Sequence, residues 1–266
     1  MKVAWAAAIV LASACAPGPA PADTAAAAVA CTVLFGTPNT RTGLTTAQCQ
    51  PACACDGKDF APPAYTSSQV DDLLAWQLTD TVTQITKNPY DHPQQHVPQP
   101  GNVCAFVPGA GRAYSLQTFP TLAAAQAAGA HVTHGGACGV CSPLTDLAVY
   151  IRQPDLTDPV RQCALSGDQQ ATVDCLRDLG FDLPCAQIWY WNTLNTRQNC
   201  LDACMANFNA PYHHPDGTLN ACLQCDEDKS GEVFKAVAGR TRRNTGVPSS
   251  MCRPCAEVLP LVHVYP

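Results

Sequence analysis

The segment HVTHGGACGVCSPLTDLAVYI, residues 131–151, places two histidines and a CxxC pair just ahead of an apolar periodic run. Two imidazoles and two thiolates suit a tetrahedral zinc or a copper site, so His131 and His134 are candidate metal ligands. A thiol at a helix start can also act as a nucleophile or redox group, which makes Cys141, Cys138 and His134 candidate catalytic residues. On a regular strand the two histidines face opposite sides, and exported cysteines tend to pair. The pattern therefore favours structural disulfides, with the metal and thiol sites as alternatives.

Two adjacent histidines, His213 and His214, lie in PYHHPDG, residues 211–217. In a loop bounded by proline and glycine, either imidazole could bind a metal or act as a base. A solvent-exposed turn is the simpler interpretation of these residues, and we prefer it.

The acidic segment CDEDKSGEVFKAV, residues 225–237, partly matches the calcium loop of an EF-hand. Asp226 and Asp228 would be the ligands at positions 1 and 3, and a serine and a glycine follow at positions 5 and 6. Position 12 is Val237 instead of the bidentate glutamate. The alternative is a helix over residues 232–238 with its cap in the acidic stretch.

The segment GRTRRNTG, residues 239–246, carries three arginines in four residues of an acidic protein. Guanidinium groups bind carboxylate or phosphate through paired hydrogen bonds, so Arg240, Arg242, Arg243 and Asn244 form a candidate anion site. Alternatively, these arginines form an internal ion-pair cluster that holds the acidic segment to its neighbours.

The composition limits the class of protein. The chain has 266 residues with 17 cysteines and 23 prolines, and only 14% are charged. So many cysteines indicate an oxidising compartment and a disulfide framework. The formal net charge of −6 argues against general nucleic-acid binding, which needs a surplus of Lys and Arg.

The first residues have the layout of a secretory signal peptide, with Lys2, a short apolar run and small residues before Cys15. We expect a signal peptide over residues 1–14, with cleavage after residue 30 as the alternative. Cys15 is then a candidate for lipidation, and its lipid would be the only membrane contact. Residues 15–30 are rich in Pro and Ala and predict a tether. A lipid-anchored and a freely secreted protein both remain open.

Residues 31–266 predict one disulfide-stapled domain, with a subdivision into 31–129 and 130–266 as an alternative. A β-α-β unit is predicted by strands over 112–120 and 130–134 with a short helix between them, paired directly or through a third strand. From residue 142 onward, caps and apolar periodicity predict mainly helices. The aromatic triplet at residues 189–191 predicts core packing, with ligand stacking as the alternative.

Two resemblances follow from these motifs. GACGVCSPLTDLAVY resembles the active-site segment of papain-type cysteine proteases, which implies Cys141 as nucleophile and Cys138 as a bridged cysteine. Ser142 and Gly135 depart from that pattern. The wider set, including CLRDLGFDLPCAQIWYWNTLNTRQNC, is similar to exported cysteine-rich proteins of unassigned function over about residues 130–255. That similarity implies no activity.

The sequence as a whole predicts a disulfide-rich α+β protein, with a small β-containing N-terminal half and a mostly helical C-terminal half. The function that we expect is an exported binding or structural module of unknown ligand and partner. The alternatives are a thiol- or metal-dependent enzyme at the HVTHGGACGVC segment and a calcium-stabilised module. We expect no cofactor, and zinc, copper or calcium are the ones that the motifs would admit.

Overall fold

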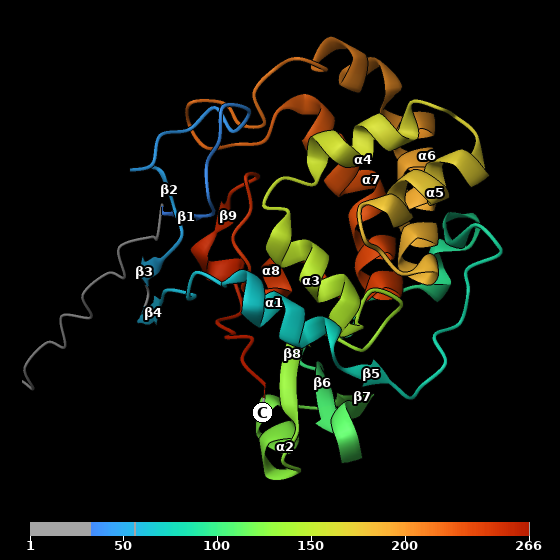
Figure 1. Cartoon of the computed structure of the whole chain (residues 1–266). Helices are drawn as coiled ribbons and strands as arrows, with labels where there is room; N and C mark the ends of the chain where they lie inside the picture. The colour runs from blue at the N-terminus through green and yellow to red at the C-terminus, as the bar shows by residue number, and fades with distance from the viewer. Residues whose placement is uncertain (1–32, 56, 266) are drawn as a thin grey trace, which may run out of the picture.

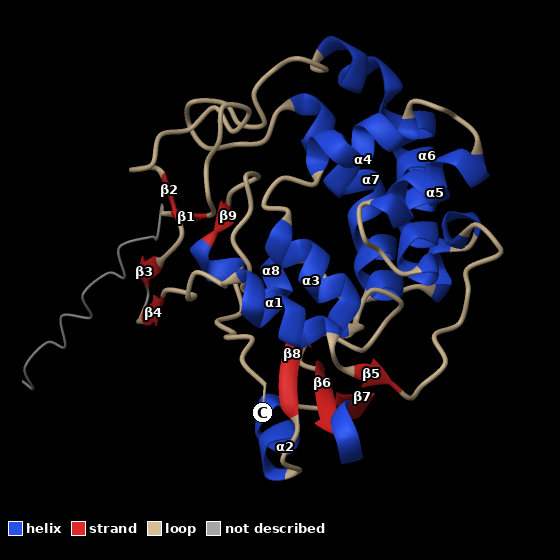
Figure 2. Cartoon of the chain, viewed as in Figure 1, coloured by secondary structure: helices blue, strands red, loops and turns tan. Residues whose placement is uncertain are grey.

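The computed structural model describes residues 33–55 and 57–265 (Figure 1). The predictions for the signal peptide, Cys15 and the tether fall outside these residues. Strands are concentrated in the first half and helices in the second (Figure 2), which confirms the α+β class. Within the described ranges, no helix has the length and apolar character needed to cross a membrane.

The largest sheet has four strands in the order β5-β7-β6-β8. These strands are β5 (Gln77–Leu78), β6 (Val103–Pro108), β7 (Ala113–Phe119) and β8 (His131–Gly135). Strand β6 pairs antiparallel with both β7 and β8. The two predicted strands, β7 and β8, therefore pair through a third strand, β6, and not directly. The helix α2 (Leu122–Ala127), capped by Thr121, connects β7 to β8 along the chain. The alternative subdivision into residues 31–129 and 130–266 would place β8 in a different domain from the three strands with which it shares this sheet.

Short strands join the two ends of the described chain. They are β1 (Leu34–Phe35) and β2 (Cys49–Gln50), which form a sheet with β9 (Arg253–Pro254), and the separate pair β3 (Cys53–Cys55) and β4 (Lys58–Phe60). Disulfides Cys49–Cys252 and Cys53–Cys255 cross-link the same regions. Such short strands hold little by themselves, so these bonds must supply much of the attachment.

The helices make up most of the second half. They are α1 (Ser67–Leu74), α3 (Leu144–Arg152), α4 (Thr157–Ala164), α5 (Gln169–Asp178), α6 (Leu183–Ala206), α7 (Ala221–Ala238) and α8 (Arg242–Thr245). Short 3₁₀ segments are Pro89–Asp91, Pro93–Gln95, Ala110–Arg112 and Cys255–Glu257. The start signal acts as expected at Thr66, whose side chain forms a capping box. At α5, Asp168 accepts a bond from the Ala171 amide.

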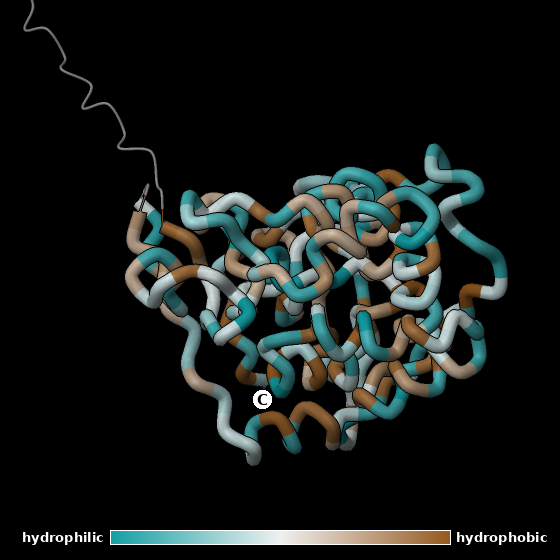
Figure 3. Tube along the Cα trace, turned by 90° about the horizontal axis from the view of Figure 1, so that it is seen from above, coloured by the Kyte–Doolittle hydropathy of each residue, from teal (hydrophilic) through white to brown (hydrophobic). Residues whose placement is uncertain are grey.

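The long helices α6 and α7 form the centre of the helical half. Disulfides Cys200–Cys225 and Cys204–Cys222 link them, and this pairing order shows that the two helices run antiparallel. Trp189 of α6 meets Phe234 of α7 edge-on with ring centroids 4.7 Å apart. Figure 3 shows hydrophobic and hydrophilic residues interleaved along the chain, as expected for a core assembled from many short amphipathic elements.

The disulfide framework ties the end strands, the four-stranded sheet and the helical half, while the segment between Cys55 and Cys104 carries no cysteine. Besides the bonds above, it contains Cys104–Cys138, Cys141–Cys185 and Cys163–Cys175, which gives seven described pairs. Cys55 is also disulfide-bonded. All 15 cysteines within the described ranges are therefore oxidised, as an extracytoplasmic compartment would allow.

Candidate functional site

The two cysteines of the CxxC motif bond to different partners. Cys138 pairs with Cys104 of β6, and Cys141 pairs with Cys185 of α6. A thioredoxin-like dithiol would join the two motif cysteines to each other, and a papain-type site would leave the second cysteine free. Neither arrangement is present, because each sulfur is held in its own long-range bond. The structure therefore gives the motif the disulfide role that the composition favoured.

His134 lies beside Ser142, but both are completely buried. The ring Nδ1 donates to the Gly135 carbonyl at 2.8 Å, so Nε2 accepts from the Ser142 hydroxyl at 2.7 Å. Burial, helped by the charge of Arg240, lowers the pKa of His134 well below its usual value. The pair resembles a base and its hydroxyl in chemistry, but no substrate reaches it. Its role is to fix a buried turn.

The predicted metal ligands do not converge. His131 packs against the rings of Phe106 and Tyr265, with centroids 5.8 and 6.0 Å away, while the ring of His134 is held by Gly135 and Ser142. Across residues 33–55 and 57–265, no three His, Cys, Asp or Glu side chains come close enough together to hold a metal ion. The parity of the two histidines on β8 explains why they separate.

The second histidine pair is also divided. His213 is buried and bonds through Nδ1 to the Gly217 carbonyl at 2.9 Å, whereas His214 is exposed. Burial lowers the pKa of His213. The prediction of a solvent-exposed turn therefore holds for His214 and is wrong for His213. His213 forms a β-bridge with Leu219, and its side chain is buried.

The acidic segment forms part of α7 and not a calcium loop. Asn220 caps this helix by accepting from the Leu223 amide, so the helix begins well before the acidic residues. Asp226 points inward and accepts bonds from Asn192, at 3.2 Å, and from Thr196, while Asp228 accepts from Gln224 on the exposed face. A continuous helix cannot wrap its side chains around one ion as a 12-residue loop does, and this corrects the calcium interpretation.

Glycines let the CxxC loop pack against the end of α7. The amides of Val140 and Cys141 bond to carbonyls of Val237 and Ala238 at 3.0 and 2.9 Å. A Cβ on Gly139 would lie 2.4 Å from the Val237 carbonyl oxygen, and one on Gly239 would lie 2.5 Å from the Gly139 nitrogen. Both positions therefore require glycine, because two backbones touch there.

Arg240 also links the CxxC loop to the end of α7, through hydrogen bonds in the protein interior. Its guanidinium is fully buried and donates to the carbonyls of Cys141 (3.0 Å), Thr133 (3.1 Å) and Ser142 (2.7 Å). Asn244 donates to the carbonyls of Gly135 and Gly239 at 2.6 and 2.7 Å. These two side chains bind the protein's own backbone, not an external anion.

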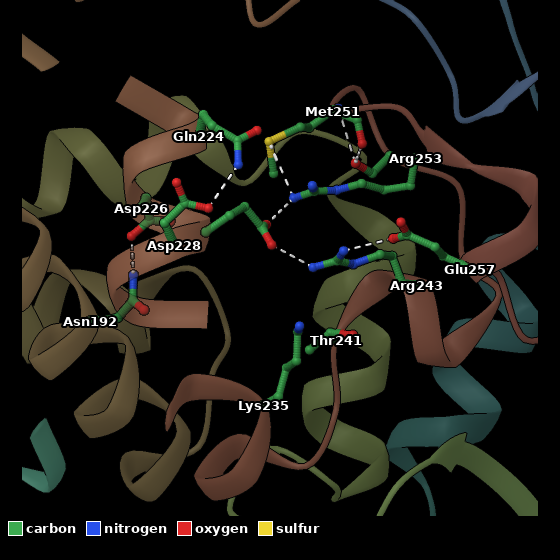
Figure 4. A network of polar contacts seen from close by, with 12 residues as sticks. Asn192, Gln224, Asp226, Asp228, Lys235, Thr241, Arg243, Met251, Arg253 and Glu257 are labelled. Atoms are coloured by element: carbon green, nitrogen blue, oxygen red, sulfur yellow. Dashed lines mark hydrogen bonds and ion pairs between the residues drawn. The ribbon is translucent and has the colours of Figure 1, made fainter. Parts of the chain in front are cut away.

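Arg243 belongs to an ion-pair network with the acidic helix (Figure 4). It contacts Glu227 at 2.5 Å and Glu257 at 2.7 Å, and Glu227 also accepts from Arg253. Burial opposes ionisation of Glu227, but Arg253 and Arg243 prevail and hold its pKa below the usual value. The alternative interpretation of the arginine segment, an internal cluster holding the acidic segment, describes this arrangement.

A groove of about 300 Å³ runs between α4, α6, α7 and the chain from residue 241 to 253. Its floor carries apolar side chains, among them Leu156, Val160, Leu223 and Phe234. Arg242 also lines it, with its guanidinium carbon 5.3 Å from the centroid of the Tyr150 ring. Two residues of the predicted anion site, Arg242 and Arg243, and one predicted calcium ligand, Asp226, line the groove, whereas Arg240 and the CxxC segment do not.

Two polar groups at the inner end of the groove have no hydrogen-bond partner among the described residues. They are the Tyr150 hydroxyl and the Trp189 indole N–H, and both atoms are buried. The two groups face each other: burial raises the pKa of Tyr150, while the Arg242 charge and the Trp189 N–H, directed as a donor at the Tyr150 oxygen, lower it, although their geometry falls short of a full hydrogen bond. Buried polar groups are nearly always hydrogen-bonded, so two unpaired neighbours on a groove wall indicate where a ligand atom would bond.

Sequence reasoning missed this groove for a physical reason. Its residues come from segments between positions 150 and 253, so no local spacing reveals them. Trp189 belongs to the aromatic triplet, and its ring does pack against the core, beside Phe181 and Phe234. The available signals were the alternative of a ligand-facing aromatic in that triplet and the candidate anion site, whose Arg242 and Arg243 line the groove.

The comparisons with known proteins agree with a cysteine-rich module of unassigned role. A family of unknown function, DUF8771, matches residues 169–261, which covers α5, α6, α7, α8 and β9. This is consistent with the similarity to exported cysteine-rich proteins, and nothing in it supports the papain-type segment. No curated protein and no solved structure matches the chain. The matched family span carries two walls of the groove, α6 and α7, and the chain from 241 to 253.

Proposed function

We propose that the protein is an exported binding module that holds a small, largely apolar molecule in the groove. The observation that carries this proposal is the pair of buried, unpaired polar atoms of Tyr150 and Trp189 on an otherwise apolar wall. Small-molecule sites have this composition, with apolar surroundings and a few polar groups that orient the ligand. A volume of about 300 Å³ lies at the lower end of their usual range.

The disulfides support the proposal because they brace the walls. Cys200–Cys225 and Cys204–Cys222 lock α6 to α7, and Cys163–Cys175 locks α4 to α5. A wall that is already ordered loses less conformational entropy when a ligand binds.

Gly231 supports it as well, because it keeps the groove open in the middle of α7. Its backbone is helical, and a Cβ there would meet only the Glu227 carboxylate, at 3.6 Å. Glycine inside a helix costs about 0.5–1 kcal/mol relative to alanine, and the fold does not need it here. A site that requires empty space explains the missing side chain.

The test is a titration with the neutral, polarity-sensitive fluorophore N-phenyl-1-naphthylamine. We expect the native protein to bind it with a blue-shifted emission, and Gly231→Trp to weaken binding by at least about tenfold, because the indole fills the groove. The matched control, Gly231→Ala, should retain most of the binding and stabilise the protein by about 0.5–1 kcal/mol through helix propensity.

Two outcomes would contradict the proposal. One is no binding of the fluorophore to the native protein. The other is equal binding by Gly231→Trp, with its fold verified by circular dichroism, because the probe would then lie elsewhere.

A further inference from the structure

We infer that the occupant of the groove is a linear amphipathic anion, with an oxyanion head at the inner end and an alkyl chain along α6. This inference rests on the proposed function and specifies its ligand class. It is carried by the charge of the walls, the unpaired donors and the course of the groove.

Basic side chains outnumber acidic ones on the walls of the groove, in a protein whose net charge is −6. The two acidic side chains that line it are Asp226 and Glu227, against six basic ones: Arg161, Arg197, Lys235, Arg242, Arg243 and Arg253. Three of the basic groups also pair with acids outside the lining, Asp158, Glu232 and Glu257, which leaves a formal excess of one positive charge. Desolvation raises the pKa of Asp226, which weakens its negative charge. Such a field favours an anion over a cation.

The inner end offers donors with no acceptor. Arg242 donates to the carbonyls of Tyr150 (2.7 Å), Pro248 (3.3 Å) and Gln153, and no carboxylate of the described chain lies within ion-pair distance of it. Asp155 acts on the Arg242 charge from beyond ion-pair distance, while desolvation lowers the pKa of Arg242 to about 10. The unpaired Tyr150 hydroxyl and Trp189 N–H adjoin it. The Trp189 N–H faces the Tyr150 oxygen, so the Tyr150 O–H is the donor that remains for a ligand, and a donor beside a cation matches an oxyanion.

Lys235 adds a second cation near this end. Figure 4 shows it pointing from α7 toward the arginine side chains, and it is one residue from Phe234, which contacts Trp189. Its own partner is Glu232, 2.9 Å away, and that carboxylate does not line the groove.

The other end of the groove opens onto exposed apolar side chains. They are Leu165 after α4, Leu201 and Met205 on α6, and Phe208 just beyond it. Trp189 and Met205 are sixteen residues apart on α6, about 24 Å along the helix axis. Arg161 also lies on the groove wall, but there it pairs with Asp158, 3.7 Å away. A long narrow groove with a polar inner end and an apolar mouth fits a molecule of the same shape and polarity.

The experiment measures displacement of the neutral fluorophore by four sixteen-carbon compounds below their critical micelle concentrations. These are hexadecanoate, hexadecyl phosphate, methyl hexadecanoate and hexadecanol. We expect the anions to displace the probe at concentrations at least about tenfold lower than the neutral compounds. Comparing the two anions separates a carboxylate from a phosphate head.

Tyr150→Phe then locates the head. We expect it to remove most of the preference for anions while binding of the neutral compounds stays unchanged. The hydroxyl has no partner in the free protein, so its loss should leave the melting temperature unchanged or raised. Tyr190→Phe, on the same helix as Trp189 but outside the groove, is the matched control and should behave like the native protein.

The outcomes are distinguishable. If the fluorophore binds but anions and neutral compounds displace it equally, the inference about the head is overturned and the proposed function stands. An anion preference that survives in Tyr150→Phe overturns the placement of the head at the inner end. If neither the fluorophore nor any alkyl compound binds, both proposals fail together.

Discussion

Removing both the Cys49–Cys252 and the Cys53–Cys255 bridges is expected to lower the free energy of unfolding by roughly 7 kcal/mol, but removing either one by only about 2–3 kcal/mol. Each bridge joins positions about two hundred residues apart, with separations of 203 and 202. While one bridge remains, the other closes only a small ring in the unfolded chain. The last one removed opens the large loop, which is worth roughly 5 kcal/mol in the chain-entropy model.

The structural consequence is also large, because the remaining ties of this region are hydrogen bonds, such as those from Lys58 to the carbonyls of Cys255 and Val258, an ion pair of Arg41 and a small apolar cluster. Strands β1, β2 and β9 are two residues long each, and β1 contacts β9 through residues 34–35 and 253–254 alone. A loss of about 7 kcal/mol equals the whole stability of many domains, so the variant without both bridges should lack a cooperative native state.

The measurement is urea unfolding without reductant, with both cysteines of each bridge replaced by alanine. The control is Cys163–Cys175, whose loop spans 12 residues far from the other two bridges. Its removal should add to the loss of Cys49–Cys252 within about 0.5 kcal/mol, as expected for independent sites. If the two end bridges also prove simply additive, the argument from a shared loop is wrong.

Replacing Arg240 with leucine is expected to destabilise the protein by about 3–5 kcal/mol. The substitution leaves the carbonyls of Thr133, Cys141 and Ser142 buried without their donor. The substitution also removes the cost of burying a charge, which offsets part of the lost stability. Desolvation lowers the pKa of Arg240, and this shows that its charged form is buried at a cost. Three unsatisfied carbonyls outweigh this gain.

The matched control is Arg152→Leu, which removes an exposed pair with Asp71 that is 2.6 Å long. Exposed pairs contribute about 0–1 kcal/mol, so this variant should stay close to the native protein in chemical denaturation. A change below about 1 kcal/mol for Arg240→Leu would show that water replaces the guanidinium, and the assignment of Arg240 as an internal clamp would be withdrawn.

The start of α1 was predictable because its signal is local. Thr66 bonds to the amide three residues ahead, a geometry that depends on side-chain type and not on the rest of the chain. The extent of α7 was missed for the opposite reason. Its acidic residues suggested a loop ligand set, but Asp226 is held by α6 side chains that no local pattern connects to it.

The candidate sites show the same division. Cys138 and Cys141 were expected to serve as disulfide cysteines, and they do, since a count of cysteines already indicates oxidation. Their partners, Cys104 and Cys185, lie 34 and 44 residues away and could not be named from spacing. The arginine segment was recognised as a charged motif, but whether Arg240 meets a ligand or a carbonyl depends on what packs over it.

The sequence by itself determined the disulfide-rich α+β class and the helical character of the second half, because composition and periodicity act over a few residues. Only the tertiary structure decided which cysteines bond, that Arg240 faces the interior, and that α4, α6, α7 and the chain from 241 to 253 enclose a groove. The physical reason is that a groove is a property of surfaces that approach from distant parts of the chain. Tyr150 and Trp189, 39 residues apart, acquire their shared unpaired position only when those surfaces meet.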